Sequence, residues 1–348
     1  MNLKFGPVTL RRAALALAMA SALGTTMTSH AQEAAKSGRA ARAAQPEAAS
    51  AAPAAVTVLA AHPVVFALTD SLAKGSSIRV ERAAPANLPA TRLTSYFNGR
   101  GGAALQKAAA SADAAVGLRS IWPDDPLYAN ARRTNIRIVE IDAARPLDGA
   151  LNGIALQSDT RPGGQFAAYP WLSIVNLGRM ADIVAADLSR LSPSDEKRIG
   201  ENLAHIKRTL VELNAKSQAG LAQAENVAVI SLSERLPYLI TEFNLDLIET
   251  NARDDKDWTP ETLAALTAKL KDNGAAAALL HRDPTPELRQ AIEAGGAKAV
   301  VLATDGADPV ADLQTNAQLL LQALAPAAAT AAATSAAAAP AAATTTAK

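Results

Sequence analysis

The chain has 348 residues, with 34 Lys and Arg against 33 Asp and Glu, four His and no Cys. This length predicts two domains or one large one, and the near-zero net charge argues against a nucleic-acid-binding protein, which needs a basic face. Without cysteine, a disulfide framework, a thiolate metal site and a cysteine nucleophile are excluded.

The N-terminal end has the pattern of a secretory signal peptide. Lys4, Arg11 and Arg12 precede an apolar run, and a small-x-small cleavage motif ends at Ala31. We therefore expect residues 1–31 to act as a Sec-type signal with cleavage after Ala31. Loss of its three positive charges would leave a mature periplasmic protein of net charge −2.

Two further segments are predicted to lie outside the folded part. Residues 32–54 are rich in Ala, Ser and Pro, which predicts a flexible linker. Residues 326–348 are almost entirely Ala, Thr and Pro and predict a disordered tail. The apolar run of the signal is too short for a permanent anchor, so we expect no membrane span after cleavage. We also expect the mature protein to be a monomer.

From residue 55 onward, short β-branched runs alternate with stretches of helical spacing. Strands are predicted at residues 56–60, 78–80, 114–118 and 136–141, and helices at residues 64–72 and 103–110. This alternation is typical of parallel β/α units. We assign residues 55–170 to an N-terminal β/α lobe.

The middle of the chain predicts helix without strand. Apolar residues recur at spacings of three and four between Leu177 and Leu213. Ser192-Pro193-Ser194-Asp195 interrupts the pattern and is typical of a helix restart. We assign residues 171–224 to one long linking helix with this break.

The β/α alternation then resumes and predicts a C-terminal lobe over residues 225–325. Strands are predicted at residues 227–230, 245–248, 277–280 and 299–302, and helices at residues 236–243, 262–271, 288–294 and 310–324. The expected fold is therefore α/β, with two parallel-sheet lobes joined by one long helix. Its default ligand site is the cleft between the lobes, where strand ends and helix starts converge.

Local patterns in the right order resemble one known family. Residues 167–172 are similar to its Asp-Pro-His-x-Trp-Leu, residues 229–245 to the segment around its Ser-His-Asp-Ala-Phe, residues 259–263 to its Ser-Pro-x-x-Leu, and residues 296–302 to its Gly-Ala-Lys-Val-x-x-Leu. The chain thus resembles the solute-binding proteins of zinc/manganese-type metal ABC importers, the ZnuA/TroA-like family. The resemblance implies a non-catalytic periplasmic protein that captures a transition-metal ion in its cleft and passes it to an ABC permease in the inner membrane.

The metal ligands are where the sequence departs from the family, whose members use three histidines and one carboxylate. Here those four positions fall on Tyr96 or Phe97, Tyr169, Ser233 and Ala303, with Asp305 two residues further on. Zinc strongly favours imidazole and thiolate ligands. We therefore expect the usual metal site to be lost or rebuilt, and the metal identity stays open.

Two histidines remain as ligand candidates. His62 follows the first predicted strand and His281 ends a later one. Each is interpreted as a ligand or hydrogen-bonding group of the cleft, or as a strand-end histidine bonded to nearby backbone. Together with two tyrosines, His62 and Asp305 would resemble, by ligand type, the sets of periplasmic ferric-ion binders.

The aromatic residues allow other interpretations. Of the twelve in the chain, five lie in two short segments: Tyr96, Phe97, Phe166, Tyr169 and Trp171. They could line a cleft for an organic solute, with anion partners among Arg92, Arg100, Arg119 and Arg235. Alternatively, the tyrosines fill the volume vacated by two imidazoles. The interpretation of this chain as a family member with a rewritten metal site depends on one expectation: Tyr96, Tyr169 and Ser233 should converge on one hollow.

No catalytic motif is present. The sequence lacks Gly-x-Ser-x-Gly, His-Glu-x-x-His, a Walker loop and Gly-x-Gly-x-x-Gly, so we do not predict an enzyme. Two functions are left: a solute receptor, and an accessory or interaction protein that kept the fold and lost transport. A receptor should gain thermal stability from one ligand, whereas an accessory protein should gain none and should bind a protein partner.

Overall fold

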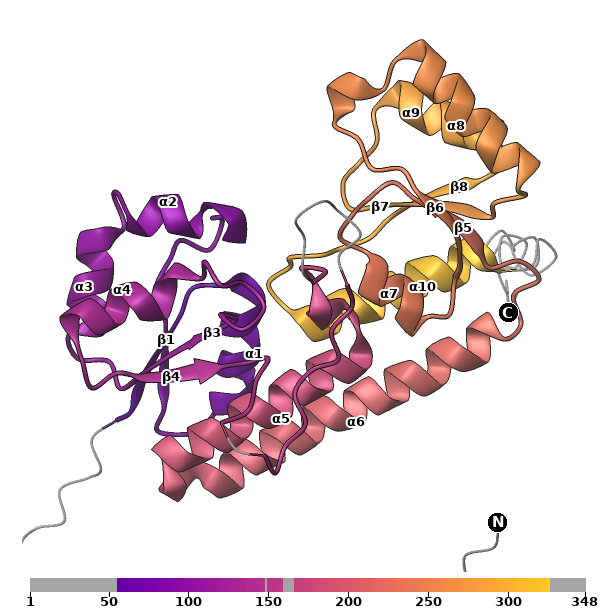
Figure 1. Cartoon of the computed structure of the whole chain (residues 1–348). Helices are drawn as coiled ribbons and strands as arrows, with labels where there is room; N and C mark the ends of the chain where they lie inside the picture. The colour runs from indigo at the N-terminus through magenta and orange to yellow at the C-terminus, as the bar shows by residue number, and fades with distance from the viewer. Residues whose placement is uncertain (1–54, 148, 159–165, 326–348) are drawn as a thin grey trace, which may run out of the picture. The chain divides into compact units, whose positions relative to one another are not determined.

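The computed structural model describes residues 55–147, 149–158 and 166–325 (Figure 1). The predicted signal peptide, linker and tail therefore lie outside the described residues. The described part contains two four-stranded sheets whose strands are all parallel. The predicted α/β class with two lobes and a long helix is confirmed.

The first sheet belongs to the N-terminal lobe. In spatial order its strands are β2 (Arg79–Arg82), β1 (Thr57–Ala60), β3 (Ala114–Gly117) and β4 (Val139–Asp142). The helices of this lobe are α1 (Pro63–Ala73), α2 (Leu93–Phe97), α3 (Gly102–Ala109) and α4 (Pro126–Thr134). Because side chains alternate along a strand, Val58 packs into the core on one face of the sheet and Leu59 into the core with Phe97 and Leu127 on the other. Residues 58–60 of β1 and 114–116 of β3 are therefore apolar and buried.

The second sheet repeats this arrangement. In spatial order its strands are β6 (Asp246–Thr250), β5 (Ala228–Ser231), β7 (Ala277–Leu280) and β8 (Lys298–Val301). Its helices are α7 (Pro237–Glu242), α8 (Pro260–Asp272), α9 (Pro286–Ala294) and α10 (Pro309–Leu324). Thr259 and Thr285, in the two Thr-Pro-Glu motifs, cap α8 and α9 with their hydroxyl groups.

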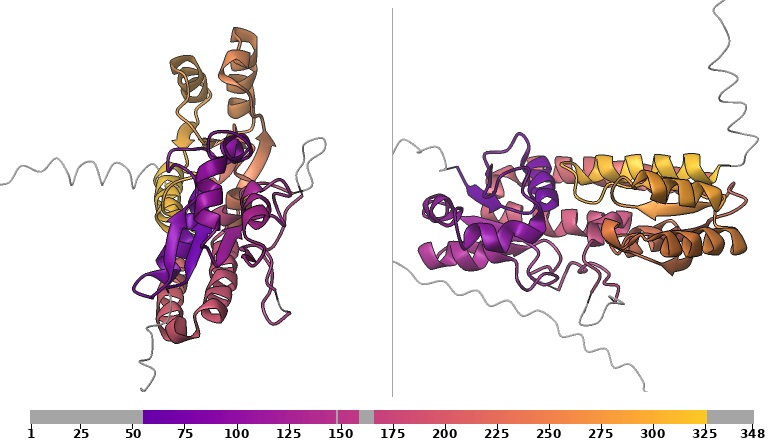
Figure 2. Two further views of the ribbon diagram at one scale, coloured as in Figure 1. Left: turned by 90° about the vertical axis from the view of Figure 1, so that its left-hand side faces the viewer. Right: turned by 90° about the horizontal axis from the view of Figure 1, so that it is seen from above.

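The predicted break in the helical stretch turns the chain back on itself. Helix α5 (Ile174–Leu191) ends there and α6 (Glu196–Leu221) begins after the short turn η3 (Pro193–Asp195), and the two lie side by side (Figures 1 and 2). They run antiparallel, since Gly178 packs near Leu210 and Lys207 Nζ lies 2.8 Å from Asp182 Oδ1. Helix α6 contacts both α1 and α10, so it joins the lobes.

Two helices were not predicted from the sequence, α2 and α4. Helix α4 carries a recognisable start, because Asp125 caps it through the backbone N–H of Leu127 and Pro126 occupies its first turn. Across the ranges that the structure describes, every helix is too short or too polar to cross a bilayer.

A buried asparagine fixes the chain after β8. Asn316, on α10, is fully buried, and its side-chain amide both accepts from the backbone N–H and donates to the C=O of Ala303, each at 2.8 Å. We expect Asn316→Leu to lower the free energy of unfolding by about 1–3 kcal/mol, because both backbone groups lose their partner. Urea denaturation measures this. Gln314→Leu, at an exposed position of the same helix, is the control; equal losses in the two variants would contradict the assignment.

Candidate functional site

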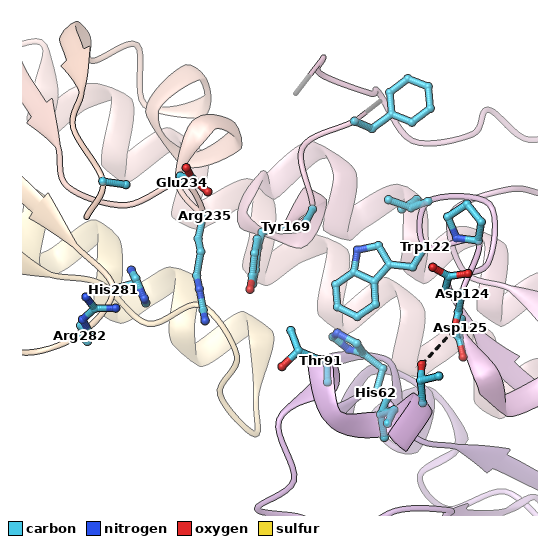
Figure 3. Close-up of a pocket in the computed structure, with 18 of the residues that line it drawn as sticks. His62, Thr91, Trp122, Asp124, Asp125, Tyr169, Glu234, Arg235, His281 and Arg282 are labelled. Carbon is cyan, nitrogen blue, oxygen red and sulfur yellow. Dashed lines mark hydrogen bonds between the residues drawn. The ribbon is translucent and has the colours of Figure 1, made fainter. Parts of the chain in front are cut away.

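A cavity of about 800 Å³ lies between the two lobes (Figure 3). One wall comes from the segments after β1, β2 and β3, and the other from the loops after β5, β6 and β7. The segment before α5 completes the cavity. In parallel sheets of this kind, ligands usually bind at the carboxyl ends of the strands. Its aromatic and chargeable lining residues are His62, Trp122, Asp124, Asp125, Phe166, Tyr169, Glu234, Arg235, Arg253, Asp254, His281 and Arg282.

His62 stands where β1 passes into α1. Its ring lies between two tryptophans, with centroids 4.9 Å from Trp122 and 4.7 Å from Trp171, both edge-on. It is 2% exposed, and neither ring nitrogen has a hydrogen-bond partner among the described residues. Burial lowers the pKa of His62 to about 3, so the ring is neutral at physiological pH. A neutral imidazole has one donor and one acceptor nitrogen, and in His62 both are enclosed by the protein.

The segment before α5 supplies the aromatic floor of the cavity. Tyr169 and Trp171 have ring centroids 5.2 Å apart, on either side of the start of the short helix η2 (Pro170–Leu172). Trp171 is buried, and its indole N–H donates to the backbone oxygen of Thr304 at 2.7 Å. This bond ties the segment to the C-terminal lobe.

Arg235 reaches into the cavity from the loop after β5. Its Nη1 lies 2.6 Å from Asp305 Oδ2 and 3.0 Å from Thr304 Oγ1, and its guanidinium carbon lies 5.0 Å from the centroid of the Tyr169 ring. Burial raises the pKa of Asp305, and the charge of Arg235 acts in the opposite direction. Asp305 itself is not part of the lining and meets the cavity through Arg235.

His281 lies beside Arg235 in Figure 3, at the end of β7. Burial, together with the charges of Arg235 and Arg282, lowers the pKa of His281 to about 4. Its buried Nδ1 has no hydrogen-bond partner within the described residues. Arg282 is held by Asp255 at 2.9 Å.

The predicted convergence of Tyr96, Tyr169 and Ser233 is not observed, because only Tyr169 lines the cavity. The Tyr96 ring packs against the turn at Gly101, where an added Cβ would overlap it, and the Arg100 guanidinium carbon lies 5.7 Å from its centroid. The short helix α2 thus directs Tyr96 toward this turn.

The other predicted residues outside the lining have local partners. Phe97 is buried in the core of the N-terminal lobe, and Arg119 makes a two-bond ion pair with Glu140 at 2.6 and 2.7 Å. Ser233 is 1% exposed and its hydroxyl accepts from the backbone N–H of Arg235 at 3.2 Å. Ser233 therefore shapes the turn that carries Arg235.

Sequence reasoning missed Trp122, Glu234, Arg253, Asp254, Arg282 and the acidic pair Asp124 and Asp125. One signal was available, since the Asp125-Pro126 helix start marks a strand-to-helix loop. The Asp125 carboxylate accepts from the backbone N–H groups of Leu118 and Leu127 at 2.9 and 3.1 Å, and burial raises its pKa. Its role here is to shape the loop.

The donor groups do not fit a free zinc ion. Zinc needs about four ligands at roughly 2.0–2.3 Å. In the part of the chain covered by the structure, no group of three or more His, Cys, Asp or Glu side chains could hold a metal ion. His62 and His281 belong to opposite lobes. The carboxylate of Asp305 is paired with Arg235 at 2.6 Å.

Fold and cavity define a two-lobed ligand-binding protein. Residues 103–331 match the family described as zinc-uptake complex component A, periplasmic (ZnuA), and the chain belongs to that family. A comparison with curated proteins finds no match.

Solved structures with the same fold include metal-binding proteins. Zn(II)-bound AdcA from Streptococcus pneumoniae is 19% identical, with a TM-score of 0.59 over 78% of this chain and 57% of that chain. A crystal structure of ZnuA is 21% identical, with a TM-score of 0.57 over 78% and 100% of the two chains. An FpvC mutant from Pseudomonas aeruginosa is 18% identical, with a TM-score of 0.60 over 77% and 98%. At these identities the likeness shows the fold.

Proposed function

We propose that this protein is the solute-binding component of an ABC importer of the metal-ion type, and that it captures its ligand in the cavity between the lobes without catalysing a reaction. The observation that carries the proposal is His62, whose buried nitrogens have no protein partner in the described residues at the wall of a cavity of about 800 Å³. Leaving buried polar atoms unpaired costs stability, which a ligand would restore.

The cellular setting follows from the family and from the sequence. Members are described as periplasmic, and residues 1–31 have the pattern of an export signal. The partner that the family implies is an ABC permease in the inner membrane, which would receive the ligand from the cleft.

The cargo is the point at which this protein differs from a zinc or manganese receptor. The usual histidines are replaced, and the ferric set of two tyrosines loses support because Tyr96 lies outside the cavity lining. We therefore assign the capture step to the cavity and leave the identity of the metal out of the assignment.

A thermal-shift experiment tests the proposal. At a ligand concentration of one hundred times Kd, binding adds about 2.7 kcal/mol to the free energy of unfolding. We expect at least one of zinc chloride, manganese chloride, sodium citrate and ferric citrate to raise the Tm of the wild type. The shift should be lost in His62→Phe and kept in His205→Phe, on an exposed position of α6. The absence of a shift with every probe would contradict the proposal and favour the accessory-protein alternative.

A further inference from the structure

We infer that Arg235 is the specificity-determining residue of this cavity: its guanidinium is a resident cation that excludes free metal cations and selects a carboxylate-bearing organic anion, alone or as a metal chelate. The inference rests on the proposed function, since it names the ligand class of the same cavity.

The guanidinium of Arg235 occupies the groups that would otherwise attract a cation. The Asp305 carboxylate and the Thr304 hydroxyl lie at 2.6 and 3.0 Å from its Nη1, and the face of the Tyr169 ring lies 5.0 Å from its central carbon. Carboxylate, hydroxyl and aromatic face all favour positive charge. A free metal ion would have to displace a covalently tethered cation to use them.

Two further arginines stand on the same wall. Arg253 and Arg282 come from the loops after β6 and β7, next to the β5 loop that carries Arg235. Arg253 Nε is held by Asn251 at 2.8 Å and Arg282 Nη2 by Asp255 at 2.9 Å, so their charges are fixed in place. Guanidinium groups match the planar geometry of carboxylates and bind them through two parallel hydrogen bonds.

The carboxylates in the lining are directed elsewhere. Asp125 is engaged by two backbone N–H groups, and Asp254 lies 3.8 Å from Lys256. Asp124 comes from the opposite lobe, and in Figure 3 the Glu234 side chain points away from the guanidinium of Arg235. The region around Arg235 and His281 is therefore governed by the arginines. In agreement, the charges of Arg235 and Arg282 add to burial in lowering the pKa of His281.

The size and lining of the cavity fit an organic molecule. Pockets for small organic ligands measure about 300–1,000 Å³ and are lined by aromatic groups with a few polar ones. This cavity measures about 800 Å³, and its lining includes the aromatic residues Trp122, Phe166 and Tyr169. His62, whose buried ring packs edge-on against Trp122, lies in the same lining.

Isothermal titration calorimetry on the purified chain separates free ions from anions. The probes are zinc chloride, manganese chloride, sodium citrate and ferric citrate. We expect the wild type to bind at least one citrate form and neither chloride. Binding of both citrate forms identifies the organic anion, and binding of ferric citrate alone identifies the chelate; both outcomes support the inference.

Variants of Arg235 test its role directly. Arg235→Gln should weaken anion binding at least about tenfold, the worth of one charge-assisted contact. Arg235→Lys keeps the charge and should weaken anion binding less. Arg198→Gln makes the same charge change outside the lining, at an exposed ion pair with Glu201, and should behave as wild type.

Two results would overturn the inference. If the wild type binds zinc or manganese chloride at one equivalent and Arg235→Gln is no different, Arg235 does not exclude cations, although the proposed function stands. If no probe gives saturable heat with the wild type, the inference and the proposed function both fail.

Discussion

Replacing Trp171 by alanine is expected to lower the free energy of unfolding by about 3–5 kcal/mol, the usual cost of removing a large aromatic side chain from a core. Trp171 is 1% exposed and its ring meets those of His62, Trp122 and Tyr169 at centroid distances of 4.7, 6.0 and 5.2 Å. Alanine would leave a void beneath the cavity floor. Urea denaturation followed by far-ultraviolet circular dichroism measures the loss.

The conservative variant Trp171→Phe separates packing from hydrogen bonding. It keeps most of the ring volume but leaves the Thr304 backbone oxygen without the indole N–H, so a smaller loss of about 1–3 kcal/mol is expected. A loss below about 1 kcal/mol in Trp171→Ala would mean that the site collapses around the void. The aromatic cluster would then not support the cavity floor rigidly.

Much of the fold could be predicted from the sequence because local signals agree with the tertiary structure. The strand Ala277–Leu280 was predicted with its observed bounds, since an apolar run of that length fits a central strand of a parallel sheet. The helix caps at Thr259 and Thr285 could be predicted because their hydroxyl groups accept hydrogen bonds from backbone N–H groups three residues further on. The restart at residue 192 was less accurate. The helix begins at Glu196, and the Ser192 hydroxyl donates to Asp195 at 2.7 Å.

The candidate site was predictable only in part, because the spacing of residues along the chain determines neither the direction of a side chain nor its pairing with a distant residue. His62 and His281 could be placed near the cavity because they follow strand ends, which meet at one edge of a parallel sheet. Tyr96 could not, because its direction depends on the five-residue helix α2 and the turn at Gly101. The pair of Arg235 with Asp305 joins residues 70 positions apart, and no local pattern signals it.

The stability of this protein should fall in mild acid because of His62. Its pKa is about 3 in the folded protein against 6.5 normally, so between these values the unfolded chain binds more protons. The contribution of neutral His62 is present above about pH 6.5 and is lost as pH falls toward 3. The slope approaches about 1.4 kcal/mol per pH unit, which gives a loss of about 2 kcal/mol between pH 8 and pH 5. His62→Phe should remove this share of the loss and leave the share of His281, whose pKa is lowered to about 4, as measured by urea denaturation across that range.

A core variant beside His62 provides the control. Val64→Ala, at a fully buried position of α1, should lower stability at every pH and keep the wild-type slope. An unchanged slope in His62→Phe would contradict the burial of a neutral ring.

At pH 8, the stabilities of His62→Phe and the wild type also test the role of His62. Phenylalanine fills the space between two tryptophans without burying unpaired nitrogens, so His62→Phe should be at least as stable as the wild type there. If His62 lowers the stability of the ligand-free protein and is needed for the Tm shift with ligand, its role is in binding. The stability of His62→Phe at pH 8 therefore distinguishes a ligand-binding role of His62 from a structural one.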